Sequence, residues 1–171
     1  MYKRQGLDYV WDKAKEDRTV EKAIFIDEIW QLLGSNSSES NHLAAEFTLE
    51  IFKVIRGYGG AAICASQDIS DFFALDDGKF GRGIINNART KIILNMEDDE
   101  ARRVQSILHL SETETMAITH FERGSGLISS NNNNITVEFK ASDLEKELIT
   151  TDRSELQAIL RRKQHQENHA Y

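Results

Sequence analysis

Acidic and amide side chains follow two short apolar runs of the sequence. Asp27 and Glu28 come directly after the run 23–26, and Gln67 follows the run 61–65. A carboxylate at the end of a buried strand can hold Mg²⁺ through water, and a second can orient or deprotonate an attacking water. A glutamine beside them can hydrogen-bond a phosphate or that water. In this order, the residue types predict a phosphate-hydrolysing site.

The same residues also have a purely structural interpretation. Asp27 can cap a following helix, with Glu28 in the first turn of that helix. Ser66 or Asp68, on either side of Gln67, can cap in the same way. Each signal is weak when it is taken alone.

Arg56 stands before the second apolar run and is followed by Gly57-Tyr58-Gly59-Gly60. Alone, it is most simply a solvated cation at a helix end, where the helix dipole favours it. It lies at the opposite end of the strand from Gln67, too far to serve its own site. In a ring of subunits it can instead reach the neighbouring subunit's nucleotide as an arginine supplied in trans.

The elements that must position these residues can be predicted from apolar patterning. The runs 23–26 and 61–65 predict buried strands, and 91–95 is a third candidate. A loop is expected over 34–41, a helix from Ala44 to Gly57, and a short helix or turn at 72–75. Residues 121–129 and 135–139 predict a hairpin closed around four asparagines.

Cap signals mark three later helices. Asn95 is expected to cap a helix whose acidic first turn is 97–100. Ser111 with Glu114, and Asp152 with Glu155, predict capping boxes. The last of these helices is expected to become polar after Lys163 and to fray by His169.

Strands that alternate with helices predict an α/β fold with a mostly parallel sheet flanked by helices, a trailing hairpin and a C-terminal helix. We expect an N-terminal arm or helix over 1–20, one α/β unit over 21–150 and a helical tail over 151–171. Open sheets of this kind bind ligands beyond the carboxyl ends of their strands.

Composition limits the function classes. The 171 residues suffice for one domain, and the net charge of −7 argues against broad nucleic-acid binding by the chain alone. The single cysteine cannot form an internal disulfide, which fits a reducing compartment. No stretch reads as a signal peptide or a membrane span. The five histidines show no metal-ligand spacing, so we expect no zinc site.

The order of the motifs is more specific than each motif alone. The segments KAIFIDEIWQLLG, FKVIRGYGGAAICASQDISDFF and GIINNARTKIILN resemble the Walker B and following motifs of the conjugative-transfer (type IV secretion) motor ATPases, within the FtsK–HerA group of P-loop NTPases. FERGSGLI and KELITTD resemble the closing segments of that family. The resemblance runs from about Lys22 to Asp152 and implies the later half of a RecA-like ATPase domain.

The resemblance also implies roles for individual residues. Asp27 would be the Walker B aspartate that acts on Mg²⁺ through water, and Glu28 the catalytic base. Gln67 would be the sensor glutamine, after Ser66 where many relatives have threonine, and Arg56 would match the arginine finger in trans. Such proteins resemble hexameric ATPases at the cytoplasmic face of the bacterial membrane, which power pilus assembly and transfer through the secretion channel.

One motif of that family is missing from the sequence. A P-loop, G-x-x-x-x-G-K-[ST], cradles phosphates with backbone N–H groups. The Gly78-Lys79 pair is followed by Phe80, and Phe73 stands five positions before Gly78, so it is no P-loop. We therefore expect the ATP and Mg²⁺ of the complete family protein not to bind this chain alone, which would be inactive. We expect the phosphate-binding half to lie upstream. An apolar sheet edge or face would then be left exposed and would invite self-association.

Three hypotheses follow. The chain is a C-terminal ATPase-domain fragment of a conjugal transfer motor, which hydrolyses ATP once the phosphate-binding half is supplied. Alternatively, it is a non-catalytic interaction module that binds a partner ATPase or a channel protein. A third hypothesis keeps the group but makes the protein a DNA-pumping or coupling ATPase, which would contact DNA indirectly. The first two are separated by whether the added upstream half restores ATP hydrolysis.

Overall fold

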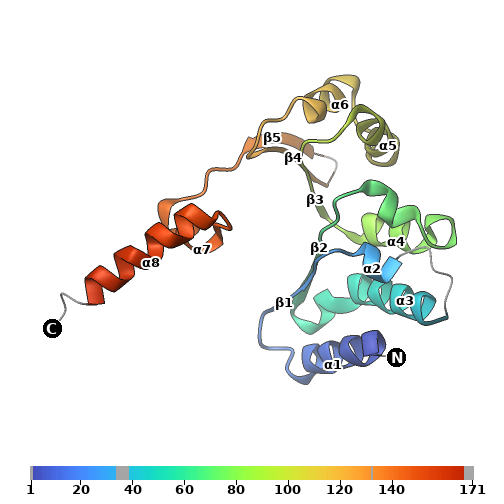
Figure 1. Cartoon of the computed structure of the whole chain (residues 1–171). Coiled ribbons are helices and arrows are strands. Elements are labelled where there is room, and N and C mark those ends of the chain that lie inside the picture. Colours follow the sequence, from blue (N-terminus) through green and yellow to red (C-terminus); the bar gives the residue numbers. More distant parts are fainter. Residues whose placement is uncertain (1, 34–38, 132, 168–171) are drawn as a thin grey trace.

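Two sheets of different kinds organise the chain in the computed structural model, which describes residues 2–33, 39–131 and 133–167 (Figure 1). The first sheet pairs β1 (Lys22–Ile26) with β2 (Gly60–Cys64) in parallel. The second sheet has the order β3-β4-β5 and is antiparallel: β3 is Thr90–Ile93, β4 is Ser125–Ser130 and β5 is Asn133–Glu138. The predicted α/β class, with a parallel sheet and a trailing hairpin, is confirmed.

Helices cover one face of the parallel pair (Figure 1). They are α1 (Tyr2–Glu16), α2 (Trp30–Leu33), α3 (Glu39–Val54) and α4 (Lys79–Asn87), with short 3-10 helices at Ile55–Tyr58, Ile69–Phe73 and Asp76–Gly78. Ile24 and Ala62 pack toward α1 and α3, where Ala14, Ile51 and Ile55 are buried. Since successive strand side chains point to opposite faces, the residues between them point away from these helices.

The helix predicted from Ala44 to Gly57 is present as α3, with different ends. It begins at Glu39 rather than Ala44 and passes after Val54 into the 3-10 helix Ile55–Tyr58. Ile51 and Ile55 are both buried, as their spacing predicted. Of the predicted loop 34–41, residues 34–38 lie outside the described residues. The short helix expected at 72–75 is present as Ile69–Phe73.

Sequence reasoning missed helix α4 because its glycines are typical of loops. Gly81 is buried, and a Cβ atom placed on it would lie 1.7 Å from the backbone oxygen of Phe72. A Cβ atom on Gly83 would meet Leu49 at 2.7 Å. Gly81 is therefore required for close packing of α4, whereas at Gly83 the flexible end of the Leu49 side chain could move aside.

The third predicted strand is present, but its expected place in the parallel sheet is wrong. β3 pairs with β4 in antiparallel register, from Thr90 opposite Ser130 to Ile93 opposite Leu127. Ile93 and Leu127 are buried in a second core beneath α5 (Asp98–Leu108) and α6 (Glu112–Thr119). This separate core holds β3 with the hairpin rather than with β2.

The cap predictions had mixed outcomes. Ser111 and Glu114 form the expected capping box of α6. Asn95 caps no helix: its amide donates to the Phe121 carbonyl at 2.9 Å, and Glu97 is the cap of α5. Two of the four hairpin asparagines, Asn133 and Asn134, belong to β5 instead of the turn.

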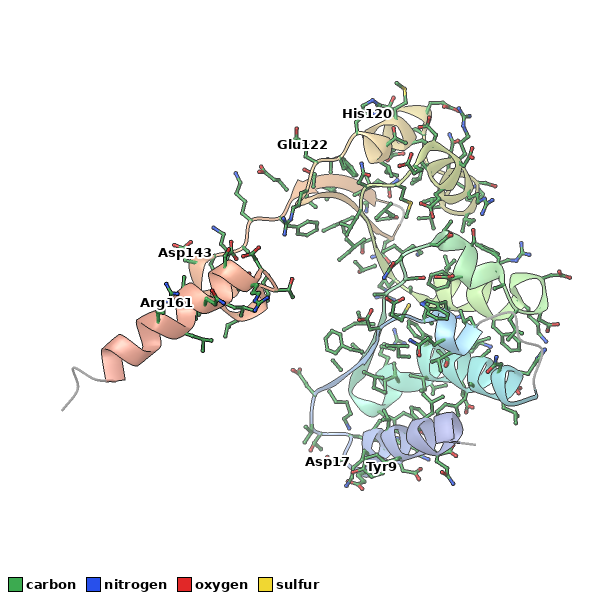
Figure 2. All side chains as sticks on the ribbon, viewed as in Figure 1. Tyr9, Asp17, His120, Glu122, Asp143 and Arg161 are labelled. Atoms are coloured by element: carbon green, nitrogen blue, oxygen red, sulfur yellow. The ribbon has the colours of Figure 1, made fainter. Side chains whose placement is uncertain are left out.

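Helices α7 (Asp143–Ile149) and α8 (Arg153–Glu167) form an arm that extends from the hairpin, away from the helices of the parallel sheet (Figures 1 and 2). Ser142 and Glu145 form a capping box at α7 that the sequence analysis missed. Asp152 accepts from the Ser154 and Glu155 amides as a cap of α8, whereas the Glu155 carboxylate accepts from Thr150. His169 lies outside the described residues.

In the described part of the chain, no helix is long and apolar enough to span a membrane.

The close packing of α4 predicts that Gly81→Ala destabilises the fold. The added methyl meets the Phe72 backbone, which has no flexible end to move, so we expect a loss of about 1–3 kcal/mol in the free energy of unfolding. Gly57→Ala is the control, because a Cβ there meets nothing within 4 Å. Urea unfolding measures both variants, and equal midpoints would contradict this role of Gly81.

Candidate functional site

A hollow of about 350 Å³ opens beyond the carboxyl ends of β1 and β2. We call it the acidic hollow; it is lined by Glu28, Trp30, Gln67, Asp68 and Asp71. Two of the sequence-predicted site residues, Glu28 and Gln67, are thus brought together from positions 39 residues apart. Three of the five lining side chains are carboxylic acids, and none is a lysine or an arginine.

The backbone turns sharply at Glu28 to reach this position. Glu28 has a φ of 51°, in the left-handed region that residues other than glycine seldom adopt. The next residue, Ile29, is fully buried, and its N–H donates to the Ala65 carbonyl at 3.1 Å. Burial of Ile29 in the core of α2 and α4 therefore fixes the turn that aims Glu28 outward.

Both oxygens of the Glu28 carboxylate are engaged. Gln67 Nε2 donates to Oε1 at 2.7 Å, and Trp30 Nε1 donates to Oε2 at 2.5 Å. Each carboxylate oxygen has two acceptor positions, so the carboxylate can still accept a hydrogen bond from water or a substrate. The arrangement holds Glu28 in one orientation and leaves it able to accept a further hydrogen bond.

The other two predicted site residues lie elsewhere. Asp27 is exposed, is not among the residues that line the hollow, and accepts from the Glu28 N–H at 2.9 Å. Arg56 is exposed in the 3-10 helix before β2, at the amino end of that strand. A five-residue strand separates it from Gln67, roughly 13 Å or more along the chain. The structure thus keeps Arg56 away from the acidic hollow of its own chain.

Sequence reasoning missed Trp30 and Asp71 as parts of the site. Asp71 accepts a hydrogen bond from the Ser66 hydroxyl, and the same hydroxyl lies 3.2 Å from the Asp68 carbonyl. Ser66 thus ties the end of β2 to the following 3-10 helix, and Asp68 caps that helix through the Ser70 N–H, as one interpretation proposed. An indole four residues after a strand carries no chemical signature, so only the fold could reveal Trp30.

Asp68 also forms a carboxyl pair with Glu100 at the start of α5. Hydrogen bonding from the Ser70 amide lowers the pKa of Asp68, and contact with Glu100 adds to this. Desolvation and the contact with Asp68 raise the pKa of Glu100. The pair is therefore most stable when Glu100 is protonated and donates to the Asp68 carboxylate.

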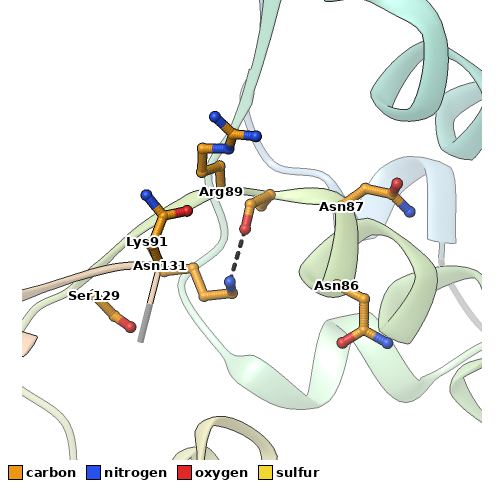
Figure 3. Close-up of a pocket in the computed structure, with 7 residues that line it drawn as sticks. Asn86, Asn87, Arg89, Lys91, Ser129 and Asn131 are labelled. Carbon is orange, nitrogen blue, oxygen red and sulfur yellow. Dashed lines mark hydrogen bonds between the residues drawn. The ribbon is translucent and has the colours of Figure 1, made fainter. Parts of the chain in front are cut away.

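A second hollow of about 320 Å³ lies where α4 passes into β3 (Figure 3). Its lining has the opposite character, with Arg89, Lys91 and polar amides. Burial lowers the pKa of Lys91, whose ammonium group donates to the Ala88 carbonyl at 2.7 Å. None of the predicted site residues lies there. Lys91 serves the turn between α4 and β3.

The acidic hollow fits part of what a nucleotide and Mg²⁺ require. Its carboxylates suit a hydrated cation and an activated water. Its lining offers no cation for phosphates, and the sequence contains no P-loop. Among the residues that the structure describes, no group of three or more His, Cys, Asp or Glu is placed to hold a metal ion. The residues present do not fit a bound triphosphate.

Comparisons with known proteins identify the class of protein to which this fold belongs. The fold matches the structure of VirB4 of Thermoanaerobacter pseudethanolicus with a TM-score of 0.72 and 26% identity, over 81% of this chain and 36% of that one. The chain thus spans about a third of the length of that relative. A search of the curated proteins finds no match. The fold is that of a P-loop ATPase of the type IV secretion class.

The family follows from a second comparison. Residues 7–162 match the model of the TraG P-loop domain, which covers most of the chain. The chain belongs to this family of conjugation and type IV secretion ATPases. The resemblance noted from the sequence motifs is confirmed.

The Asp68–Glu100 pair predicts a pH-dependent effect of Glu100→Gln. The pKa of Glu100 is raised in the fold. The contribution of the protonated Glu100 side chain to stability is therefore complete below about pH 4.3 and is lost as the pH rises through the raised pKa. Glutamine donates to Asp68 at every pH. The variant should therefore match the original protein at low pH and exceed it at neutral pH, by less than about 1 kcal/mol because the pair is solvent-accessible.

Thermal unfolding measured from pH 4 to 8 checks this expectation. Glu122→Gln, at an exposed glutamate in the loop between α6 and β4, is the control and should show no growing difference. A melting difference for Glu100→Gln that is constant across the pH range would contradict the pairing.

Proposed function

We propose that this chain is the part of a conjugative-transfer motor ATPase that activates water for ATP hydrolysis. Glu28 acts as the general base. Gln67 orients Glu28 and senses the state of the nucleotide, while Asp27 acts on Mg²⁺ through water. Arg56 serves the site of a neighbouring subunit. ATP and Mg²⁺ supply the phosphoanhydride and its charge-neutralising cation when they are bound.

The observation that carries this proposal is the Gln67–Glu28 hydrogen bond. It joins the ends of two parallel strands at 2.7 Å and orients a half-buried carboxylate over a hollow. A structural cap would point its carboxylate at backbone N–H groups. Glu28 instead receives two side-chain donors and faces solvent, which supports a role in proton transfer.

The exposed position of Arg56 supports a ring. An arginine at the amino ends of the strands cannot reach the acidic hollow of its own chain, but it can reach that of an adjacent subunit. We propose that the complete protein works as such a ring, a hexamer as in the family, at the cytoplasmic face of the membrane. There it would drive pilus assembly and substrate transfer with the secretion-channel components, and contact DNA indirectly.

The acidic hollow lacks cationic groups that could bind phosphate. We therefore predict that the isolated chain binds ATP negligibly and does not hydrolyse it. Carboxylates alone repel a triphosphate, and no lysine or arginine lines the hollow. Titration of the purified chain with a fluorescent ATP analogue and Mg²⁺ should show no saturable binding. Saturable micromolar binding would mean that a nucleotide site exists without a P-loop.

The role of Glu28 is tested in cells that carry the gene. Glu28→Gln keeps the side-chain shape and removes the base, so conjugative transfer should fall at least about 100-fold. Glu46→Gln, at an exposed position of α3, is the matched control and should leave transfer unchanged. Normal transfer by Glu28→Gln at normal protein levels would exclude Glu28 as the base.

A further inference from the structure

The 3-10 helix Ile69–Phe73 connects the two cores of the chain, and we call it the connecting helix. Phe72 packs against the core of α2 and α4, whereas Ile69 packs against the core beneath α5 and α6. Among the described elements, the most extensive contact between the parallel and the antiparallel half of the fold joins the connecting helix to α5. A displacement of α5 therefore acts on the parallel half chiefly through this helix.

Polar contacts tie the first turn of the connecting helix to α5. The Arg103 guanidinium donates to the Ser70 hydroxyl. The Glu100 carboxyl group pairs with Asp68 and also accepts from the Ile69 N–H. Asp68 caps the connecting helix by accepting from the Ser70 N–H at 2.6 Å, and the positive charge of Arg103 lies close to it. Side chains of α5 thus hold the backbone directly after Gln67.

Gln67 lies between two anchored points of the backbone. Before it, the Ala65 N–H donates to the Ile26 carbonyl at 3.0 Å; after it comes Asp68, which is held by α5. The Gln67 side chain is exposed and donates to Glu28 at 2.7 Å. A hydrogen bond weakens steeply as its distance and angle change, so the position of this backbone decides whether Glu28 stays oriented. The contacts made by α5 therefore bear on the geometry of the acidic hollow.

We propose that Arg103 is a positioning residue for the acidic hollow. By holding Ser70, it fixes the connecting helix and so keeps Gln67 where it can orient Glu28. Arg103 does not line the hollow, so it acts through these residues. A movement of the antiparallel half relative to the parallel half would change this placement, which gives the second core control over the site. The inference rests on the proposed function, since it concerns the same general base.

The indole N–H signals in an NMR spectrum of the isotope-labelled chain test this role. The chain has two tryptophans: Trp30 donates its indole N–H to Glu28, and Trp11 packs between α1 and α3. Gln67→Ala provides the reference shift of the Trp30 signal, because it removes the other side-chain donor to Glu28. Arg103→Ala should move the Trp30 signal in the same direction and leave the Trp11 signal in place.

Arg102→Ala is the matched control. Arg102 is the neighbouring residue on α5, it is exposed as Arg103 is, and its loss changes the net charge equally. This variant should leave the Trp30 signal unchanged, and both variants should keep the urea midpoint of the original chain. Ser70→Ala removes the acceptor of the Arg103 bond without a change in charge, so it should reproduce the shift of Arg103→Ala.

A double substitution tests the route. If Arg103 acts through Gln67, adding Arg103→Ala to Gln67→Ala should not move the Trp30 signal further, because both changes interrupt the same series of contacts. A further shift in the double variant would overturn the proposal. An unchanged Trp30 signal in Arg103→Ala, or an equal shift in Arg102→Ala, would also overturn it.

Conjugative transfer in cells that carry the gene measures the consequence. Arg103→Ala should reduce transfer at least about tenfold, since a displacement of about 1 Å at a catalytic group can cost about 100-fold in rate. Arg103→Lys should restore transfer to within about threefold, because the bond to Ser70 uses one nitrogen and lysine can donate in the same way. Arg102→Ala should leave transfer unchanged. Where Glu28→Gln loses transfer, full transfer by Arg103→Ala would overturn the proposal.

The indole signal does not depend on hydrolysis, so it separates this inference from the proposed function. A Trp30 shift in Arg103→Ala, with normal transfer by Glu28→Gln, would retain the positioning role and reject Glu28 as the base. Loss of transfer by Glu28→Gln, with an unmoved Trp30 signal in Arg103→Ala, would retain the base and reject the positioning role.

Discussion

The candidate site depends on a short extension of the parallel β1–β2 ladder. Beyond the last paired residues, the Ala65 N–H donates to the Ile26 carbonyl at 3.0 Å, and the Ile29 N–H donates to the Ala65 carbonyl at 3.1 Å. These bonds keep the two chains in register after the strands end, so the side chains that follow meet at one place. Without them, Glu28 and Gln67 would lie on independent loops and their hydrogen bond would have no fixed geometry. Main-chain pairing, more than side-chain attraction, therefore assembles the site.

The core beneath this ladder explains why Glu28 tolerates a left-handed backbone. Ile29 and Leu33 are buried with Phe80 and Ile84, which come from α4. A strained φ at a non-glycine residue costs of order 1–3 kcal/mol and persists only where the surroundings fix it. Burial of one isoleucine side chain is worth a similar amount, about 1.5–3 kcal/mol. The packing of α4 thus holds a carboxylate outward at a point where a relaxed backbone would aim it elsewhere.

Sequence patterns predicted the parts of this fold that depend on local chemistry. Both parallel strands, the Ser111–Glu114 capping box and the placement of Glu28 and Gln67 after the strand ends follow from residue type and order. What was missed depends on distant contacts. α4 is helical because its glycines admit the Phe72 backbone, and β3 joins the hairpin because Ile93 shares a core with Leu127. Trp30 enters the site only through the turn at Glu28. No pattern within a short window contains these contacts.

The acidic hollow and the exposed sheet face belong to the same pair of parallel strands. A parallel pair buries its second face only when another layer packs on it, and that layer also determines which charges stand at the strand ends. Here the described chain places carboxylates at the site and leaves Phe25 and Ile63 exposed. Hydrolysis of a phosphoanhydride needs both a base and cationic groups, because a base activates water only against a phosphate whose charge is neutralised. Division of the two between the layers would make catalysis conditional on assembly, so that water is activated only when the sheet is complete.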